Sequence, residues 1–106
     1  MAVMMHGIDV EQASLEAGDE YFQLWQEFLT DNLHKFIDPN IIADPYGGDI
    51  EYCFQHAVEV LIKENIMISE DWLDALEIAA YVLPMYADKF AEYAKGVRAY
   101  HAKASA

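Results

Sequence analysis

Apolar residues recur at intervals of three and four along much of the chain, which is the period of an amphipathic α-helix. Asp9 is a typical N-cap residue. Gly18 and Asp19 favour a break, because glycine costs about 1 kcal/mol relative to alanine inside a helix. We therefore predict a short helix after Asp9 and a longer helix that ends near residue 36. The apolar positions of the two helices are Leu15, Tyr21, Phe22, Leu24, Trp25, Phe28, Leu29, Leu33 and Phe36.

Two more amphipathic segments follow, and each is preceded by a residue that commonly caps helices. Asp49 precedes an apolar face composed of Ile50, Phe54, Ala57, Val58, Leu61 and Ile62. Ser69 precedes a second face composed of Trp72, Leu73, Leu76, Ala79, Ala80 and Leu83. Pro84 should end or kink this helix, because it lacks an N–H and clashes with the carbonyl four residues back. A last helix is predicted from Met85 towards His101.

The helical pattern is interrupted between residues 37 and 48. Two Asp-Pro steps, Asp38-Pro39 and Asp44-Pro45, push the residues before each proline out of helical geometry, and a glycine pair ends the segment. We predict the one long loop of the chain here. No stretch alternates apolar and polar residues convincingly, so no substantial sheet is expected, and Asn65–Ile68 is the best candidate for a short extended piece.

These elements predict an all-α fold, a single small domain of four to five helices over residues 1–106. The 106 residues suit one domain and are enough to build a hydrophobic core. The apolar content of 55% and the aromatic content of 13% exclude the composition of disordered chains. Residues 1–8 and 102–106 are expected to fray, as chain ends commonly do.

Acidic side chains outnumber basic ones by 19 to 6, which gives a formal net charge of −13. Direct binding to DNA or RNA is excluded as a function class, because phosphate contacts need clustered lysine and arginine. An acidic protein is also repelled by anionic lipid headgroups. The charge is uneven: the part before residue 85 holds 17 acids and two bases, whereas Lys89, Lys95, Arg98 and Lys103 outnumber Asp88 and Glu92 after it.

Cysteine content and apolar runs predict a cytoplasmic protein that does not enter a membrane. Cys53 is the only cysteine, so an intramolecular disulfide is impossible. Residues 1–10 contain no lysine or arginine, so the charged start of a secretory signal is missing. The longest apolar run, Ile78 to Ala87, has ten residues and includes Pro84, whereas a membrane helix requires roughly 20.

The residues that could carry chemistry do not form a known metal-binding or catalytic pattern. No histidine has a glutamate three positions before it, as di-iron helical bundles require. Cys53 and His56 share a helical face, but two ligands do not make a zinc site, and a buried small side chain beside a histidine is the simpler interpretation. Ile42 and Ala43 stand where a calcium-binding loop needs an oxygen ligand and a glycine. We therefore expect no catalytic residue, no bound metal, no cofactor and no enzymatic activity.

The last helix carries a seam of apolar and aromatic residues spaced by four, three, four and three positions. We treat this seam as a candidate interface with a partner or a second copy, because tyrosine is enriched where proteins meet. The alternative, equally compatible with the spacing, is that the seam belongs to the core of the monomer. Ala87, Ala91 and Ala94 beside it would allow another helix to approach. The seam consists of Tyr86, Phe90, Tyr93, Val97 and Tyr100.

A second candidate interface lies in the predicted loop, where Ile41, Ile42 and Tyr46 stand among turn-forming residues. Apolar side chains in a loop either cover their own core or contact a partner.

Surface physics favours an inhibitory binding protein, because an acidic field attracts basic proteins such as DNA-binding regulators and nucleases. An anti-activator would cover the dimerisation surface of a transcriptional regulator with apolar helices. An immunity protein or DNA mimic would fill a basic site with carboxylates. A small helical metal-binding protein or enzyme that uses Cys53 and His56 is the remaining alternative.

The small acidic profile, the central segment from Phe36-Ile37-Asp38-Pro39 to Asp49-Ile50-Glu51-Tyr52, and the aromatic helix after Leu83-Pro84 resemble the quorum-sensing anti-activators of the QslA type. This resemblance spans most of the chain. It implies an all-helical homodimer that binds the ligand-binding domain of a LuxR-type regulator such as LasR. Such binding would block dimerisation of the regulator and so prevent its binding to DNA.

Overall fold

The chain folds into an assembly of helices, which a computed structural model describes over residues 3–105, without the side chains of residues 46, 82, 84–86 and 105. The all-α fold class predicted from the sequence is confirmed, although the described residues form six α-helices where four to five were predicted. Within the described residues the α-helices are α1 (Val10–Glu16), α2 (Asp19–Leu33), α3 (Pro39–Ala43), α4 (Ile50–Lys63), α5 (Glu70–Ala79) and α6 (Pro84–Ser105). Two short 3-10 helices complete the set: η1 (Pro45–Gly48) lies between α3 and α4, and η2 (Ala80–Val82) lies between α5 and α6. No helix among the described residues has the length and apolar character needed to span a membrane.

The three predicted helix caps all form. The Asp9 carboxylate accepts a hydrogen bond from the backbone N–H of Gln12 at 3.1 Å, and the Asp49 carboxylate accepts one from Tyr52 at 3.1 Å. The Ser69 hydroxyl accepts one from the N–H of Trp72 at 3.2 Å. Each bond satisfies an N–H that has no partner within the helix, which fixes where α1, α4 and α5 begin.

The predicted breaks are also confirmed. Helix α1 ends at Glu16, its C-cap residue Ala17 has a left-handed φ of 51°, and α2 starts after Gly18. Helix α5 gives way to η2, and Pro84 is the first residue of α6. A proline is well tolerated there, because the first N–H groups of a helix have no intrahelical acceptor.

The segment from 37 to 48, which we predicted as a single loop, contains two short helices, α3 and η1. Asp38 caps the short helix α3 by accepting a hydrogen bond from the N–H of Asn40 at 2.7 Å, and Pro39 occupies the first turn. Pro39 and Pro45 are therefore the first residues of short helices, and they also lie between the longer helices α2 and α4. The segment Asn65–Ile68, our candidate for an extended piece, pairs with no strand among the described residues.

A small hairpin at the N-terminus was not predicted, since we expected residues 1–8 to fray. Strand β1 (Met4–Met5) pairs antiparallel with β2 (Ile8–Asp9) through a two-residue turn at His6 and Gly7, whose φ angles are 52° and 81°. Met5 and Ile8 are buried against the helices. Two-residue strands are too short to show an alternating pattern, so the sequence carried no visible signal. At the other end, where we also expected fraying, α6 continues to Ser105.

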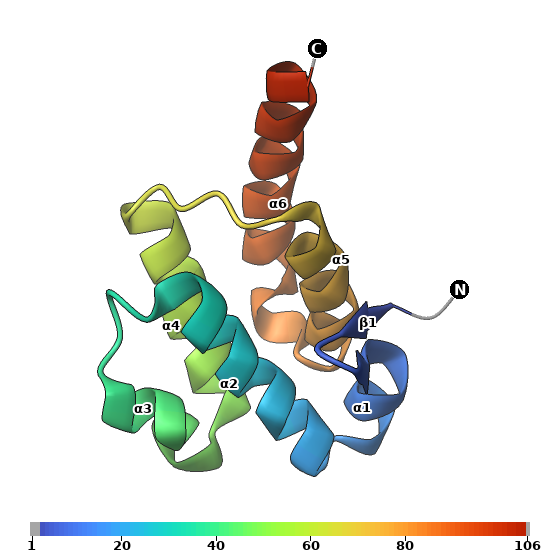
Figure 1. Ribbon diagram of the computed structural model, residues 1–106, viewed down its shortest axis with the longest axis vertical. Helices are drawn as coiled ribbons and strands as arrows, with labels where there is room; N and C mark the ends of the chain where they lie inside the picture. Colours follow the sequence, from blue (N-terminus) through green and yellow to red (C-terminus); the bar gives the residue numbers. More distant parts are fainter. Residues whose placement is uncertain (1–2, 106) are drawn as a thin grey trace.

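Aromatic side chains from the four longest helices meet at the centre of the molecule. Trp25 of α2 lies 5.2 Å from Phe54 of α4 between ring centroids, and Phe54 lies 5.7 Å from Phe90 of α6. Phe28 of α2 lies 5.5 Å from Trp72 of α5. Figure 1 shows α2, α4, α5 and α6 arranged around this centre, with α1 and the hairpin packed at one side. The aromatic core is defined as these five residues.

We predict that Phe90→Ala lowers the free energy of unfolding by about 3–5 kcal/mol, because it leaves a cavity between Phe54 and Tyr93. Tyr100→Ala on the same helix is the matched control and should change stability by less than about 1 kcal/mol, since the Tyr100 side chain is exposed. Urea denaturation followed by tryptophan fluorescence measures both variants. Equal midpoints for the two variants would contradict the assignment of Phe90 to the core.

Candidate functional site

The seam predicted on the last helix divides between the core and the surface. Phe90 is 1% exposed and Val97 is 2% exposed, so both belong to the core of the monomer. The core alternative therefore holds for these two residues, and in this fold neither offers a side chain to a partner. The physical reason is that α6 packs against both α4 and α5, and its apolar stripe fills the space between them.

The tyrosines of the seam have different surroundings. Tyr93 is half-buried, and its hydroxyl donates a hydrogen bond to the carbonyl of Ile66. Burial raises the pKa of the Tyr93 phenol above its usual value of 10.0. Tyr100 is 54% exposed. The side chain of Tyr86 lies outside the described residues.

A shallow hollow of about 250 Å³ remains between α4 and α6. Tyr93 lies on one side of it, and Ile62 and Met67 lie on the other. Ile62 and Met67 are both exposed. This hollow, which we call the α4/α6 groove, is the exposed remainder of the interface predicted on α6.

The loop candidates Ile41 and Ile42 are half-buried on α3 and pack against the core. The side-chain amide of Gln26 donates hydrogen bonds to the carbonyls of Ile42 at 3.2 Å and Ala43 at 2.7 Å, which ties α3 to α2. Of the two roles considered for these isoleucines, covering their own core is what the structure shows. Tyr46, the third candidate, lies outside the described side chains.

Cys53 lies in the core of α4, 1% exposed, and burial raises the pKa of its thiol to about 12. A thiol with so high a pKa stays protonated near neutral pH, so it is a poor nucleophile and a poor metal ligand. Among the described residues, no three or more histidine, cysteine, aspartate or glutamate side chains gather as metal ligands would.

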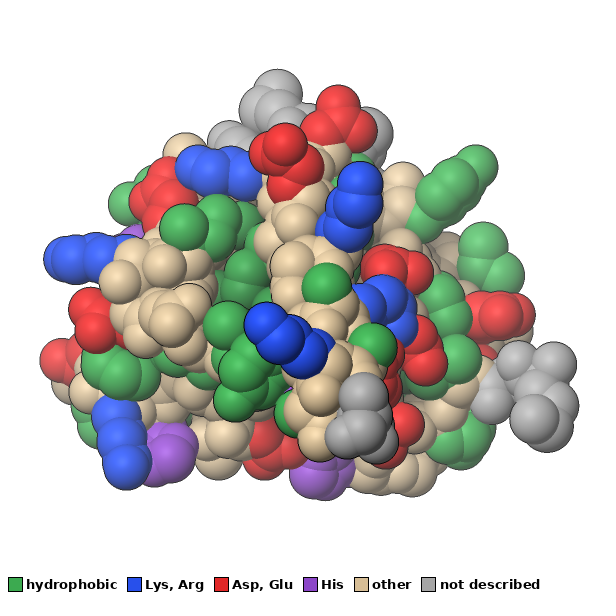
Figure 2. Space-filling view, turned by 90° about the horizontal axis from the view of Figure 1, so that it is seen from above, with side chains coloured by type: hydrophobic (Ala, Val, Ile, Leu, Met, Phe, Trp, Pro, Cys, Tyr) green, Lys and Arg blue, Asp and Glu red, His purple; other side chains and the backbone are tan. Residues whose placement is uncertain are grey.

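Arg98 of α6 forms ion pairs with three carboxylates of α5. Its guanidinium donates hydrogen bonds to Glu70, to Asp74 at 2.9 Å and to Glu77 at 2.9 Å. These bonds raise the pKa of Arg98 further above its usual value, with the Glu77 bond as the largest cause. The cluster holds α6 against α5. Figure 2 shows the end of the molecule where α6 terminates, with basic side chains spread among acidic and apolar ones.

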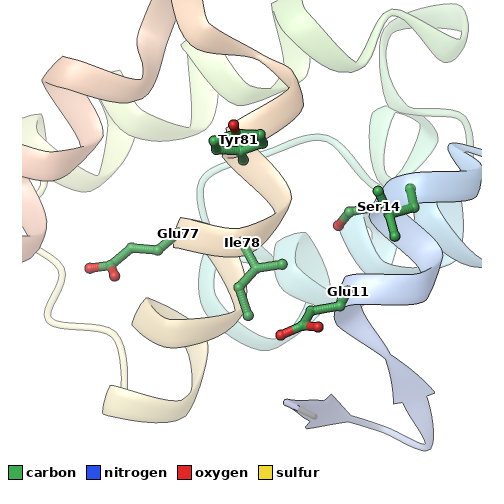
Figure 3. A pocket seen from close by; sticks show the side chains of 6 residues that line it. Glu11, Ser14, Glu77, Ile78 and Tyr81 are labelled. Atoms are coloured by element: carbon green, nitrogen blue, oxygen red, sulfur yellow. The ribbon is translucent and has the colours of Figure 1, made fainter. Parts of the chain in front are cut away.

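An open hollow of about 410 Å³ lies between α1 on one side and α5 with η2 on the other. Its apolar lining residues are Leu15 of α1, Ile78 of α5 and Tyr81 of η2, and Glu11, Ser14 and Glu77 line it as well. Figure 3 shows Ile78 and Tyr81 on one wall and Ser14 and Glu11 on the facing wall. We call this hollow the α1/α5 groove.

Leu15 and Tyr81 are the two most exposed of the large apolar side chains among the described residues, at 79% and 84%. Both line the α1/α5 groove. Single exposed apolar side chains are common on protein surfaces, but a contiguous group around a hollow is typical of a binding site.

The Ser14 hydroxyl is an unpaired polar group within this groove. Ser14 is 4% exposed, and its Oγ has no hydrogen-bond partner among the described residues. Figure 3 shows the hydroxyl directed into the space between α1 and α5. A buried hydroxyl without a partner costs about 1–3 kcal/mol, which a bound molecule with a suitable donor or acceptor would recover.

The two helices that form the groove carry acidic and no basic side chains. Arg98 compensates part of this charge from α6. The remaining negative field favours basic binding partners over acidic ones. The acids are Glu11 and Glu16 on α1, and Glu70, Asp71, Asp74 and Glu77 on α5.

The N-terminal hairpin holds α1 in place, because β2 runs directly into that helix through Asp9. His6 at the hairpin turn donates a hydrogen bond from Nε2 to the Asp31 carboxylate of α2 at 2.7 Å, and its Nδ1 lies 3.8 Å from a Glu27 oxygen. Its ring lies 5.9 Å from that of Trp72. The bond to Asp31, with the charge of Glu27, raises the pKa of His6 above 6.5.

Sequence reasoning missed this groove, because it assigned Leu15 to an inward face and gave Ile78 and Tyr81 no role. The buried residues of α1 are Val10, Ala13 and Ser14, which define a face that excludes Leu15. Ile78 lies on α5 outside the set of its buried residues, and Tyr81 follows three positions later in η2. The sequence did carry one signal for the groove: these apolar residues lie outside the buried face of their helix, which is typical of an exposed apolar surface.

Comparison of the chain with protein-family models, with curated proteins and with solved structures finds no match.

We predict that His6 stabilises the fold more at low pH than at high pH. A pKa raised by folding adds stability that is fully present below pH 6.5 and is lost as the pH rises through the pKa of the folded state. Urea denaturation of the wild type and His6→Gln at about pH 5.5 and about pH 8.5 measures this contribution. The stability difference between the two proteins should be larger at the lower pH, and a difference independent of pH would refute the His6–Asp31 pairing.

Proposed function

We propose that the protein inhibits another protein by covering one of its functional surfaces, and that it catalyses no reaction. The proposed partner is a LuxR-type transcriptional regulator, as the resemblance to QslA-type anti-activators implies. Binding would block dimerisation of the regulator and its contact with DNA. Such regulators act in the cytoplasm, so the inhibitor is proposed to act there as well.

The observation that supports this proposal is the α1/α5 groove, where Leu15 and Tyr81 leave most of their apolar surface in water. Burying one large apolar side chain on binding is worth about 1.5–3 kcal/mol. A partner that covered both side chains would therefore gain enough to offset part of the entropy lost on association.

The competing proposal, an immunity protein or DNA mimic, requires carboxylates that are free to face a basic site. In α5, Glu70, Asp74 and Glu77 are engaged by Arg98. This arrangement favours apolar occlusion over charge mimicry, although the net charge of −13 would still speed the encounter with a basic partner.

The resemblance also implies a homodimer, and we assign the second copy to the α4/α6 groove, which is lined by Ile62, Met67 and Tyr93. Helix α6 carries both signs of charge, so two copies meeting there would repel each other less than two acidic surfaces. Light scattering of the protein alone tests this assignment, since the mass of one chain would rule the dimer out.

We predict that an equimolar amount of the protein abolishes DNA binding by a signal-loaded LuxR-type regulator such as LasR. Gel-shift titration measures the loss of the DNA complex, and light scattering identifies the new complex between the two proteins. Because apolar contacts are weakly screened, inhibition should fall by no more than about threefold between about 0.05 M and 0.3 M salt.

The control is a regulator already bound to DNA as a dimer, which should resist inhibition over short times. No loss of DNA binding at any ratio would contradict the anti-activator proposal. A loss of inhibition of about tenfold or more over the same salt range would favour the DNA-mimic alternative.

A further inference from the structure

We propose that the α1/α5 groove receives an amphipathic helix of the partner, with large apolar side chains on one face and lysine or arginine beside them. This inference rests on the proposed function, because it names the surface through which the inhibition occurs. Three observations carry it: the apolar lining, the unpaired Ser14 hydroxyl and the sign of the surrounding charge.

The shape and lining of the groove suit a helix better than a flat surface. Its volume of about 410 Å³ lies within the range of about 300–1,000 Å³ that ligand sites occupy. Leu15 and Tyr81 come from opposite walls, so an inserted side chain would contact both. A helix that presents apolar residues three and four positions apart places successive side chains along such a groove.

The Ser14 hydroxyl adds a requirement for one polar group in the occupant. It is nearly fully buried, has no partner among the described residues and points into the groove. A purely apolar occupant would leave this hydroxyl unpaired, whereas a side-chain amide or hydroxyl at the right position would satisfy it. The expected helix therefore carries one such group on its apolar face.

Charge decides between a foreign helix and a second copy of this chain. Helices α1 and α5 hold six acids and no base between them, and Arg98 of α6 pairs with three of these acids, so the surface keeps a negative charge that is only partly compensated. Two copies that met groove to groove would place these acids opposite each other, which is unfavourable. A helix with basic flanks would instead meet opposite charge, and lysine or arginine beside its apolar face would approach Glu11.

Three designed helical peptides of about 14 residues test the proposal, a length that forms about four turns. The first has leucine on one face, with one central asparagine, and lysine elsewhere. The second replaces every lysine with glutamate, and the third replaces every leucine with glutamine. Calorimetry gives the Kd of each peptide, and backbone amide NMR shifts locate the site on the folded protein.

The leucine–lysine peptide is expected to bind and to shift the amides of α1, α5 and η2. The glutamate and glutamine peptides are expected to bind at least about tenfold more weakly, because each lacks one of the two required features. Absence of binding, equal binding of either control peptide, or shifts confined to α4 and α6 would overturn the proposal.

Surface variants separate the groove from other apolar positions. Leu15→Gln and Tyr81→Gln alter exposed side chains, so both should remain folded while the Kd of the leucine–lysine peptide rises at least about tenfold. Tyr100→Gln is the matched control and should leave the Kd unchanged. Equal effects at Tyr81 and Tyr100 would mean that the peptide binds exposed apolar side chains indiscriminately, and the proposal would fail.

A double comparison tests the role of Ser14. Wild type should bind the asparagine-containing peptide about threefold to tenfold better than Ser14→Ala does, whereas a peptide with leucine in place of that asparagine should not distinguish the two proteins. If wild type and Ser14→Ala bind both peptides with the same Kd, the Ser14 hydroxyl does not contact the bound helix, and this part of the proposal is wrong.

The same variants in the regulator assay separate failure of this inference from failure of the proposed function. If wild type inhibits the regulator and Leu15→Gln and Tyr81→Gln inhibit equally well, the inhibition uses another surface and the groove assignment is wrong. If wild type does not inhibit, the anti-activator proposal is wrong, and peptide binding then decides the groove assignment alone.

Discussion

The packing of aromatic rings between α2, α4, α5 and α6 is the interaction on which the rest of the structure depends. Trp25, Phe28, Phe54, Trp72 and Phe90 link all four helices through ring contacts of 5.2 to 6.0 Å. Trp25–Phe28 and Phe28–Trp72 pack edge to face, a geometry that contributes beyond the area the rings bury. Phe90 belongs to this packing and Val97 is buried beside it, so these two residues of the α6 seam hold the monomer together.

That commitment limits which apolar side chains remain for the partner that we propose. Once the core is filled, the apolar side chains that remain in water are few, and Leu15 and Tyr81 are the most exposed of those described. They come from α1 and η2, far apart in the sequence, and the hairpin that His6 ties to α2 holds α1 beside α5. The acids of these helices make the surface around the groove negative, which favours the basic helix that we propose as its occupant.

The sequence predicted the long helices well, because their signals are local. Caps at Asp9, Asp49 and Ser69 and the break at Pro84 act on the backbone of neighbouring residues, so no tertiary contact is needed to recognise them. The hairpin and α3 are too short for a period to be visible. The groove could not be predicted, since the exposure of Leu15 depends on which face of a seven-residue helix packs inward. Likewise, spacing alone could not assign Phe90 to the core, because core and interface seams have the same period.

The central claim is that the protein works by placing its α1/α5 groove on another protein. Hydrogen–deuterium exchange of the protein with and without the ligand-binding domain of a LuxR-type regulator measures this contact directly. The account predicts slower exchange in α1, the end of α5 and η2 when the regulator domain is present, with the core amides of α6 unchanged. Slower exchange confined to α4 and α6, or no change anywhere, would contradict it.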